Sequence, residues 1–373
     1  MKVVLAICGT KHYFGLPKYF YFLSKHLARQ GIEVEVILDS RAGQWNLQEV
    51  FEGGPYPRVK IITPTCQEDM WNAPKTAIWS WKVAQYLRHK KFDVLHCGHV
   101  TPYFYLRQRN RKPVVFQPFG NEAVIFAEKS KGLRKVLYNF AAGVTKYCGK
   151  NADVLLAEGE WQLEEMERIY GRKESLVMLG GVDIDFIEKQ AGNNLVTRER
   201  LGIGKEVSVT LTVNTFHSYK DYSNLIRALP SLENITAIMV GVGPEKLKCV
   251  DLVYDLGVSE KVIFLDDIPE HLLYGLYKIA DVYVSPTKVE DFQMGIAEAE
   301  VLGLPIVSTG QKFQIDGNGF VVGKGNPRKL AYGIKEALQL KAVLGKKSKE
   351  VARRYGFKEA AEEAIRIYEK LEG

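Results

Sequence analysis

Short, continuously apolar runs alternate with amphipathic helical patterns along nearly the whole chain of 373 residues. Strands that are apolar at every position are typical of parallel sheets with helices on both faces, because neither side of such a strand meets water. The pattern therefore predicts an α/β fold with two doubly wound sheets, one in each half of the chain. The expected strands are residues 2–7, 32–38, 59–63, 93–96, 113–117 and 154–157, then 207–213, 235–240, 262–265, 282–284 and 306–308. The expected helices are residues 17–30, 75–89, 133–148, 222–229, 245–256, 272–279, 296–302, 327–340 and 357–371.

The boundary between the two domains is expected where this periodicity lapses, at Gly180-Gly181 and again at Gly192-Asn193-Asn194. We expect an N-terminal domain over residues 1–178 and a C-terminal domain over residues 179–354. The last helical pattern has no strand after it, so its packing is not tied to the second sheet. We expect residues 355–373 to return to the N-terminal domain.

Composition narrows the class of protein. Hydrophobic residues make up 46% of the chain and charged residues 25%, which is ordinary for a globular protein and excludes a mainly disordered one. No run of about 18 apolar residues is present, so no membrane-spanning helix is expected. The five cysteines form no Cys-x-x-Cys pair, which argues against a disulfide framework or a zinc ribbon. We expect a cytoplasmic protein with no metal ion. Asp183 and Asp185 have the spacing of a metal motif, but the preceding Gly181-Val182 favours a turn between domains.

The net charge of +7 is unevenly distributed. Residues 1–150 carry 23 Lys and Arg against 10 Asp and Glu, a net charge of +13, while residues 151–373 carry −6. The basic runs, with Tyr103, Phe104, Tyr105 and Tyr138 among them, comprise Arg107, Arg109, Arg111, Lys112, Lys129, Lys131, Arg134 and Lys135. Such runs fit an anionic membrane surface, a nucleic acid or a solvated helix face. Since no nucleic-acid motif accompanies them, we expect no nucleic-acid partner.

Glycines follow three of the expected strands, at the sheet edge where doubly wound folds bind their ligands. Gly9 follows the first strand, Gly180-Gly181 follows Met178, and Gly241-Val242-Gly243-Pro244 follows the strand that ends at Val240. No Gly-x-Gly-x-x-Gly fingerprint and no P-loop is present, so a dinucleotide cofactor is only weakly supported. Backbone N–H groups in such turns can face an anion.

Two carboxylates are the most informative pair of polar residues. Glu290 and Glu298 lie in a segment that follows an expected strand and enters an expected helix. If Glu290 lies in the loop and Glu298 in the helix, both can face one crevice. A carboxylate accepts two hydroxyl hydrogen bonds, which suits a sugar or a ribose diol.

This segment resembles the Glu-x7-Glu signature of glycosyltransferase family 4, whose members are retaining enzymes with the GT-B fold of two Rossmann-like domains. Further pieces fall in the order of that family and extend the resemblance over nearly the whole chain. They lie at residues 15–17, 92–99, 180–183, 213–220, 240–244 and 318–322. The resemblance implies a hexosyltransferase that needs no metal and no cofactor. Its donor is a nucleotide-diphosphate sugar, bound mainly by the second domain across an interdomain cleft.

The resemblance also implies roles for residues of the second domain. Glu290 holds hydroxyls of the donor sugar, Glu298 holds the ribose hydroxyls, and Lys220 neutralises the diphosphate leaving group. We expect Glu290 and Lys220 to be catalytic. The backbone N–H groups of residues 292–294 face the diphosphate and the sugar. The expected donor set is Glu298, Phe292, Gln293, Met294, Thr215, Gly241, Gly243 and Ile268.

Residues of the first domain are expected to meet the acceptor. Gly15 opens the first helix, His12 lies in the first glycine loop, and His99 lies in the loop after a strand. Phe119 stands where the family has a histidine beside the donor sugar. The acceptor class stays open: it is lipid-linked, a saccharide or a small polar molecule.

The chain departs from the family pattern at several positions. Thr215 stands in place of an arginine that binds phosphate, Phe119 in place of the histidine, and Asp291 and Gln293 in place of two glycines. These departures keep open the alternative of a non-catalytic protein that binds sugar nucleotides. A nucleic-acid binder is a weaker alternative, and the paired glutamates argue against an epimerase of the same fold.

Overall fold

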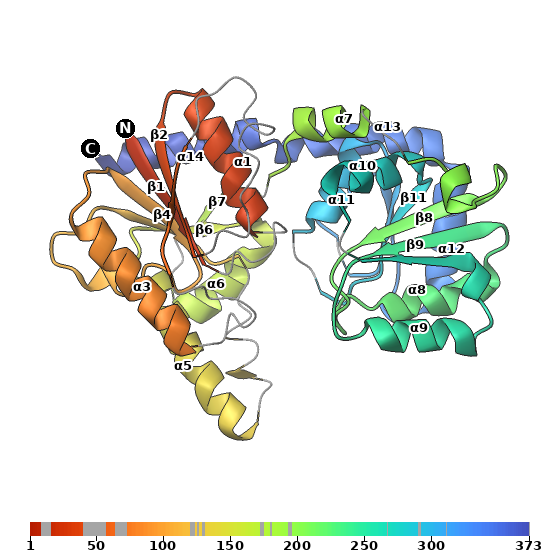
Figure 1. Ribbon diagram of the computed structural model, residues 1–373, viewed down its shortest axis with the longest axis horizontal. Coiled ribbons are helices and arrows are strands. Elements are labelled where there is room, and N and C mark those ends of the chain that lie inside the picture. Colours follow the sequence, from red (N-terminus) through yellow and green to blue (C-terminus); the bar gives the residue numbers. More distant parts are fainter. Residues whose placement is uncertain are drawn as a thin grey trace. The chain divides into compact units, whose positions relative to one another are not determined.

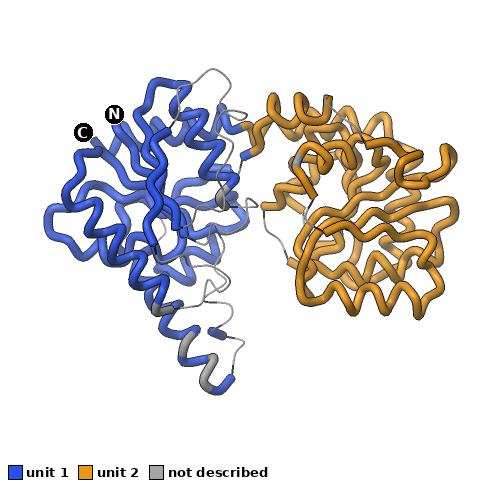
Figure 2. The backbone as a smooth tube through the Cα atoms, in the orientation of Figure 1, with its two compact units in different colours: residues 1–181, 357–373 blue, residues 182–356 orange. Residues whose placement is uncertain are grey.

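The computed structural model divides into two compact units (Figure 2). It describes residues 1–8, 16–39, 57–63, 73–119, 124, 127–128, 131–171, 175–179, 181–192, 196–266, 268–289, 292–310 and 312–372. Unit 1 comprises Met1–Gly181 and Phe357–Gly373, and unit 2 comprises Val182–Gly356. The sequence predicts these boundaries between residues 178 and 179 and between residues 354 and 355. Within the described ranges, no helix combines the length and the apolar composition that crossing a membrane requires.

The described strands of unit 1 form a parallel sheet in the order β3-β2-β1-β4-β5-β6-β7. They are β1 (Lys2–Ile7), β2 (Glu33–Leu38), β3 (Arg58–Ile61), β4 (Val94–Gly98), β5 (Val114–Gln117), β6 (Val154–Ala157) and β7 (Leu176–Val177). The strand order turns back between β1 and β4. Ligands of such sheets bind beyond the carboxyl ends of the strands at this switch point.

Helices cover both faces of this sheet (Figure 1). On one face, Val4 and Ala6 of β1 share a buried core with Trp79 and Val83 of α3 (Ala73–Arg88). Helices α5 (Gly132–Asn151) and α6 (Leu163–Tyr170) complete that face. On the other face, α1 (Leu16–Arg29) packs against α14 (Phe357–Glu372). Alternate residues of β1 therefore enter different cores, which explains why the strand is apolar throughout.

Aromatic contacts fix the C-terminal helix α14 to unit 1. The ring of Phe357 lies 5.4 Å from that of Tyr19 and 5.6 Å from that of Phe22, centroid to centroid. At the other end of α14, the buried hydroxyl of Tyr368 lies 2.6 Å from Nδ1 of His96 on β4. The helix thus returns to the first sheet, as the sequence predicts.

The described strands of unit 2 form a second parallel sheet in the order β10-β9-β8-β11-β12-β13. They are β8 (Ser208–Val213), β9 (Ile235–Val240), β10 (Val262–Leu265), β11 (Val282–Ser285), β12 (Ile306–Ser308) and β13 (Gly319–Val321). Its helices are α7 (Ile184–Gly192), α8 (Tyr222–Ala228), α9 (Lys246–Asp255), α10 (Glu270–Ile279), α11 (Met294–Val301), α12 (Pro327–Gln339) and α13 (Lys341–Ala352). The predicted class, two doubly wound α/β domains, is confirmed.

Candidate functional site

The carboxyl edge of the unit 2 sheet gathers most of the residues expected to bind the donor. Because β8, β9, β11 and β12 run parallel, the loops after them meet at one edge. Residues 214–220 follow β8, residues 241–244 follow β9, and α11 begins at this edge after β11. Ile268 follows β10 and is half-buried. Glu290 lies outside the described residues.

Gly241 and Gly243 hold two of these loops together by close backbone contact. Gly241 has φ +143°, and a Cβ atom there would lie 1.9 Å from the carbonyl oxygen of Asn214. Gly243 has φ +154°, and its Cβ would lie within 2.8 Å of three backbone atoms of Phe216. The Phe216 N–H donates to the Val242 carbonyl at 2.9 Å. Both glycines are required because the turn after β9 touches the loop after β8.

Lys220 lies at the end of the loop after β8 and is 7% exposed. Its Nζ lies 5.4 Å from the centroid of the Tyr219 ring, and its backbone N–H donates to the His217 carbonyl at 2.9 Å. Burial lowers the pKa of His217, and the charge of Lys220 lowers it further. A neutral His217 at neutral pH leaves Lys220 as the cation of this loop. Thr215 is exposed, and its N–H donates to Asn214 Oδ1 at 2.9 Å.

Gln293 connects three segments at the start of α11. Its side-chain oxygen accepts Ser285 Oγ at 2.7 Å and Asn214 Nδ2 at 3.5 Å, so it joins the ends of β11 and β8. Its backbone N–H donates to Gln314 Oε1 at 2.8 Å, and its carbonyl accepts Gln314 Nε2 at 3.1 Å. The Gln293 N–H, which is expected to face a phosphate, is engaged by Gln314 in this structure. Phe292 packs edge-on against Tyr355, with ring centroids 5.5 Å apart, and Met294 opens the helix.

Glu298 lies inside α11 and is 4% exposed. Its carboxylate accepts the hydroxyl of Tyr277 at 3.0 Å and that of Tyr274 at 3.3 Å. Burial, reinforced by the charge of Glu298, raises the pKa of Tyr277 well above its ordinary value, so Tyr277 stays a donor. Since an ionised carboxylate has about four acceptor positions, Glu298 can accept ribose hydroxyls in addition.

Glu300, two positions further along α11, is fully buried and was not expected from the sequence. Asn318 Nδ2 donates to its Oε1 at 2.8 Å. Burial raises the pKa of Glu300 well above its ordinary value, and the Asn318 hydrogen bond only partly opposes this. The sequence patterns did not predict Gln314, Tyr274 or Tyr277 either. Of the residues around Glu300, only Asn318 lies in a segment, 318–322, that the sequence analysis identified.

The carboxyl edge of the unit 1 sheet holds two of the expected acceptor residues. His99 follows β4 and Phe119 follows β5, which are paired neighbours, and both have φ of 54°. The Phe119 ring packs against Tyr19 at 4.9 Å and Phe20 at 5.4 Å between centroids. Left-handed backbone at non-glycine residues is strained and concentrates at functional sites. His12 and Gly15 lie outside the described residues.

The two histidines of the unit 1 edge differ in their partners. Burial lowers the pKa of His99 to about 4, and its buried Nε2 has no hydrogen-bond partner among the residues that the structure describes. His96 is also buried and neutral, but it contacts Tyr368 and Gln117 in the core. Of these two histidines, His99 is therefore the better placed to bind a ligand. No metal-binding cluster of His, Cys, Asp or Glu exists within the described segments.

Two family models match this chain. The description of the first is "Glycosyltransferase Family 4" and it matches residues 15–186; that of the second is "Glycosyl transferases group 1" and it matches residues 194–359. An uncharacterized glycosyltransferase of Methanocaldococcus jannaschii is 26% identical over 95% of this chain and 94% of its own length. A D-inositol 3-phosphate glycosyltransferase of Corynebacterium diphtheriae is 25% identical over 79% of this chain and 73% of its own length.

Solved structures share the fold along the whole chain. A sucrose-phosphate synthase of Thermosynechococcus elongatus has a TM-score of 0.81 at 18% identity and covers 100% of this chain and 99% of its own. The HepE protein of Anabaena, solved with UDP-glucose, has a TM-score of 0.77 at 17% identity and covers 99% of both chains. The matched ranges, the order of the motifs and the two doubly wound sheets all indicate the same family and fold. The chain belongs to glycosyltransferase family 4, among the group 1 glycosyltransferases, and has their GT-B fold.

Proposed function

We propose that this glycosyltransferase moves a hexosyl unit from a nucleotide-diphosphate sugar to a hydroxyl acceptor, with retention and without a metal ion. The observation that carries the proposal is the gathering of Lys220, the Gly241–Gly243 turn and Glu298 at one edge of the unit 2 sheet. This edge offers a cation and backbone donors to a diphosphate, and a carboxylate to a ribose.

Lys220 is the residue we expect to stabilise the leaving group. Negative charge develops on the diphosphate as the bond to the sugar breaks, and a preorganised cation lowers the energy of that transition state. The nearly complete burial of Lys220 strengthens its field, because less water screens it. Since Thr215 carries no charge, Lys220 does this without the arginine of the family pattern. Glu290 is proposed to hold the donor sugar.

The donor is proposed to be a UDP-sugar. HepE, which shares the fold, was solved with UDP-glucose, and this comparison supports uracil as the base of the donor. The acceptor is proposed to be anionic or to lie on an anionic surface, because residues 1–150 carry a net charge of +13. The D-inositol 3-phosphate of the named relative is one acceptor of that kind.

We also propose a cytoplasmic protein that attaches peripherally to anionic membranes through the first turns of α5. Lys131 and Lys135 are exposed there. Val136 and Phe140 lie one turn apart on the same helix and are 63% and 59% exposed. Cations beside exposed apolar side chains on one helix are typical of membrane-surface segments.

A second candidate is a protein that binds the sugar nucleotide without transferring the sugar. The observation that favours it is the engagement of the Gln293 N–H by Gln314, which occupies a donor expected to face the phosphate. Thermal-shift screening against UDP, GDP, ADP and their sugars identifies the nucleotide. Turnover with the best donor then separates the candidates, since binding without sugar transfer or slow donor hydrolysis would favour the second.

A further inference from the structure

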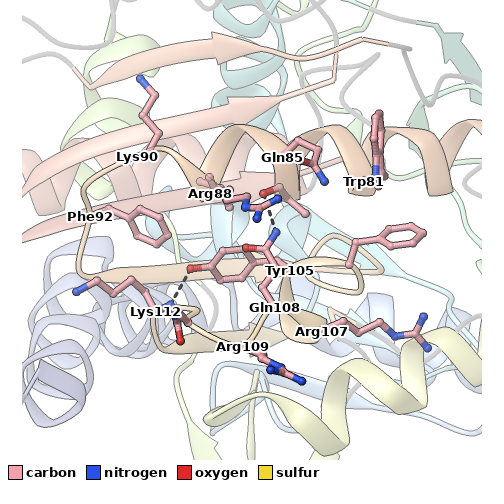
Figure 3. Close-up of a pocket in the computed structure, with 14 residues that line it drawn as sticks. Trp81, Gln85, Arg88, Lys90, Phe92, Tyr105, Arg107, Gln108, Arg109 and Lys112 are labelled. Carbon is pink, nitrogen blue, oxygen red and sulfur yellow. Dashed lines mark hydrogen bonds between the residues drawn. The ribbon is translucent and has the colours of Figure 1, made fainter.

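A cavity of about 690 Å³ opens in unit 1 on the face covered by α3 (Figure 3). One wall is the C-terminal half of α3, and the other is the segment 104–112, which connects β4 to β5. Arg88 and Lys90 come just before β4, and Arg109 and Lys112 come just before β5. These residues therefore lie toward the amino edge of the sheet. His99 and Phe119, the expected acceptor residues, follow the same strands at the carboxyl edge.

The lining of this cavity is strongly basic. It includes Arg88, Lys90, Arg107, Arg109 and Lys112, and no Asp or Glu. Two of these cations have other contacts. The Arg107 guanidinium lies over the rings of Tyr103 and Tyr147, and Lys90 lies 4.6 Å from the Tyr86 ring centroid and interacts with Glu35.

The other three cations have no counter-charge among the described residues. Within the segments that the structure describes, the side chains of Arg88, Arg109 and Lys112 form no ion pair and no hydrogen bond with another residue. The neighbouring Arg111, in contrast, is paired with Asp153 at 2.5 Å. Like charges gathered around a concave surface repel each other, and a bound anion relieves that repulsion.

Hydrogen bonds hold the two walls of the cavity in place. Gln108 Nε2 donates to the carbonyl of Ala84 on α3 at 3.0 Å. The buried Tyr105 hydroxyl accepts the Lys112 backbone N–H at 2.8 Å, which fixes the end of the 104–112 segment. Figure 3 shows Arg88 above Tyr105 and Gln108, with Trp81 further along the same helix. The cavity is thus formed before any ligand arrives, which lowers the entropic cost of binding.

We propose that this cavity binds a small organic phosphate with at least two anionic groups. Arginine forks match phosphate oxygens in a bidentate manner, and three unpaired cations call for more than one anionic charge. The volume suits a ligand of metabolite size, and Trp81, which is 49% exposed, offers a flat apolar surface to the body of the ligand. This site lies on unit 1 and does not depend on the proposed donor site.

Calorimetric titration of the full chain with inorganic pyrophosphate tests this proposal. The double variant Arg88→Gln/Arg109→Gln should weaken pyrophosphate binding at this cavity by at least about tenfold, because two charged contacts are lost. The control Arg29→Gln/Arg366→Gln removes the same charge elsewhere on unit 1 and should bind as the wild type does. Lys220→Ala, which alters the proposed diphosphate site of unit 2, should leave this binding component in place.

Three results would overturn the proposal. The first is pyrophosphate binding that the cavity variant and its control weaken equally. The second is pyrophosphate binding that is lost completely in Lys220→Ala. The third is a lipid source of the phosphate. If phosphatidic acid in phosphatidylcholine vesicles binds the wild type but not the cavity variant, while pyrophosphate has no affinity, the ligand is a lipid headgroup and not a small molecule.

Discussion

Two glutamates on α11 meet different surroundings although they are only two positions apart. Glu298 keeps two tyrosine hydroxyls as partners at the edge where we place the donor. Glu300 points into the core and receives the Asn318 amide. The pair therefore offers a matched comparison between a proposed binding residue and a structural one.

Glu298→Gln should weaken binding of the best nucleotide by about ten- to hundredfold, because hydrogen bonds to a charged acceptor contribute about 1.5–3 kcal/mol. Glu300→Gln should leave that affinity unchanged. Calorimetric titration of both variants with the same nucleotide provides the comparison. Equal affinities for wild type and Glu298→Gln would remove Glu298 from the donor site.

Glu300 also predicts a pH dependence of stability. Because its pKa is raised in the folded chain, the folded state holds the proton more tightly than the unfolded state does. The contribution of protonated Glu300 to the free energy of unfolding is complete below the ordinary pKa of 4.5. It is lost as the pH rises from there toward the raised pKa of the folded chain. Glu300→Gln should therefore gain stability relative to the wild type as the pH increases. Melting temperatures at a series of pH values test this; two parallel curves would contradict it.

At the scale of elements, the turn after β9 is held by backbone contact and tolerates no side chain. Gly241→Ala places a methyl group against the Asn214 carbonyl in a disfavoured conformation, and should cost at least about 2 kcal/mol of unfolding free energy. Gly257→Ala is the matched control, because Gly257 has φ +63° with nothing within 4 Å of its Cβ position. It should cost only about 1 kcal/mol. Thermal unfolding gives both values, and equal losses would show that conformation alone explains Gly241.

The sequence predicts continuously apolar strands well and the less regular peripheral elements poorly. The bounds of β1, β6, β9 and β12 coincide with the expected ranges, since strands buried on both faces leave a continuous apolar run. The bounds of the half-buried edge strand β10 coincide as well, because its four residues are all apolar. The edge strand β7 was missed because it has two residues, of which Leu176 is 45% exposed. Helix α13 was missed because it follows α12 with neither Gly nor Pro between them.

Motifs in the sequence predicted part of the candidate site. The rule that ligands bind at strand carboxyl ends predicted a role for the Gly241 turn, and the resemblance to glycosyltransferase family 4 implied the roles of Thr215 and Lys220. The partners of Glu298 and Gln293 could not be predicted in this way. Tyr277 and Gln314 reach them from other elements, and such contacts depend on tertiary packing that no local pattern records.

For the whole molecule, the uneven charge predicts salt-dependent membrane attachment. The chain should sediment with anionic vesicles at low salt and dissociate at high salt, because each Lys or Arg near such a surface contributes about 1 kcal/mol that salt screens. Lys131→Gln/Lys135→Gln should reduce partitioning by about thirtyfold, while Lys335→Gln/Lys346→Gln on unit 2 should not change it. If anionic and neutral vesicles bind the chain equally poorly at low salt, the charge is only a solvated surface and a small polar acceptor becomes the better proposal.

Unit 2 is proposed to use Lys220 to release a nucleoside diphosphate from a nucleotide sugar. The most direct measurement is the rate of nucleoside diphosphate release from a panel of nucleotide sugars, for the wild type and for Lys220→Ala. We predict release from at least one donor by the wild type, and a loss of about 100-fold or more in the variant. No release from any donor by the folded wild type, or equal rates for the two proteins, would contradict this account.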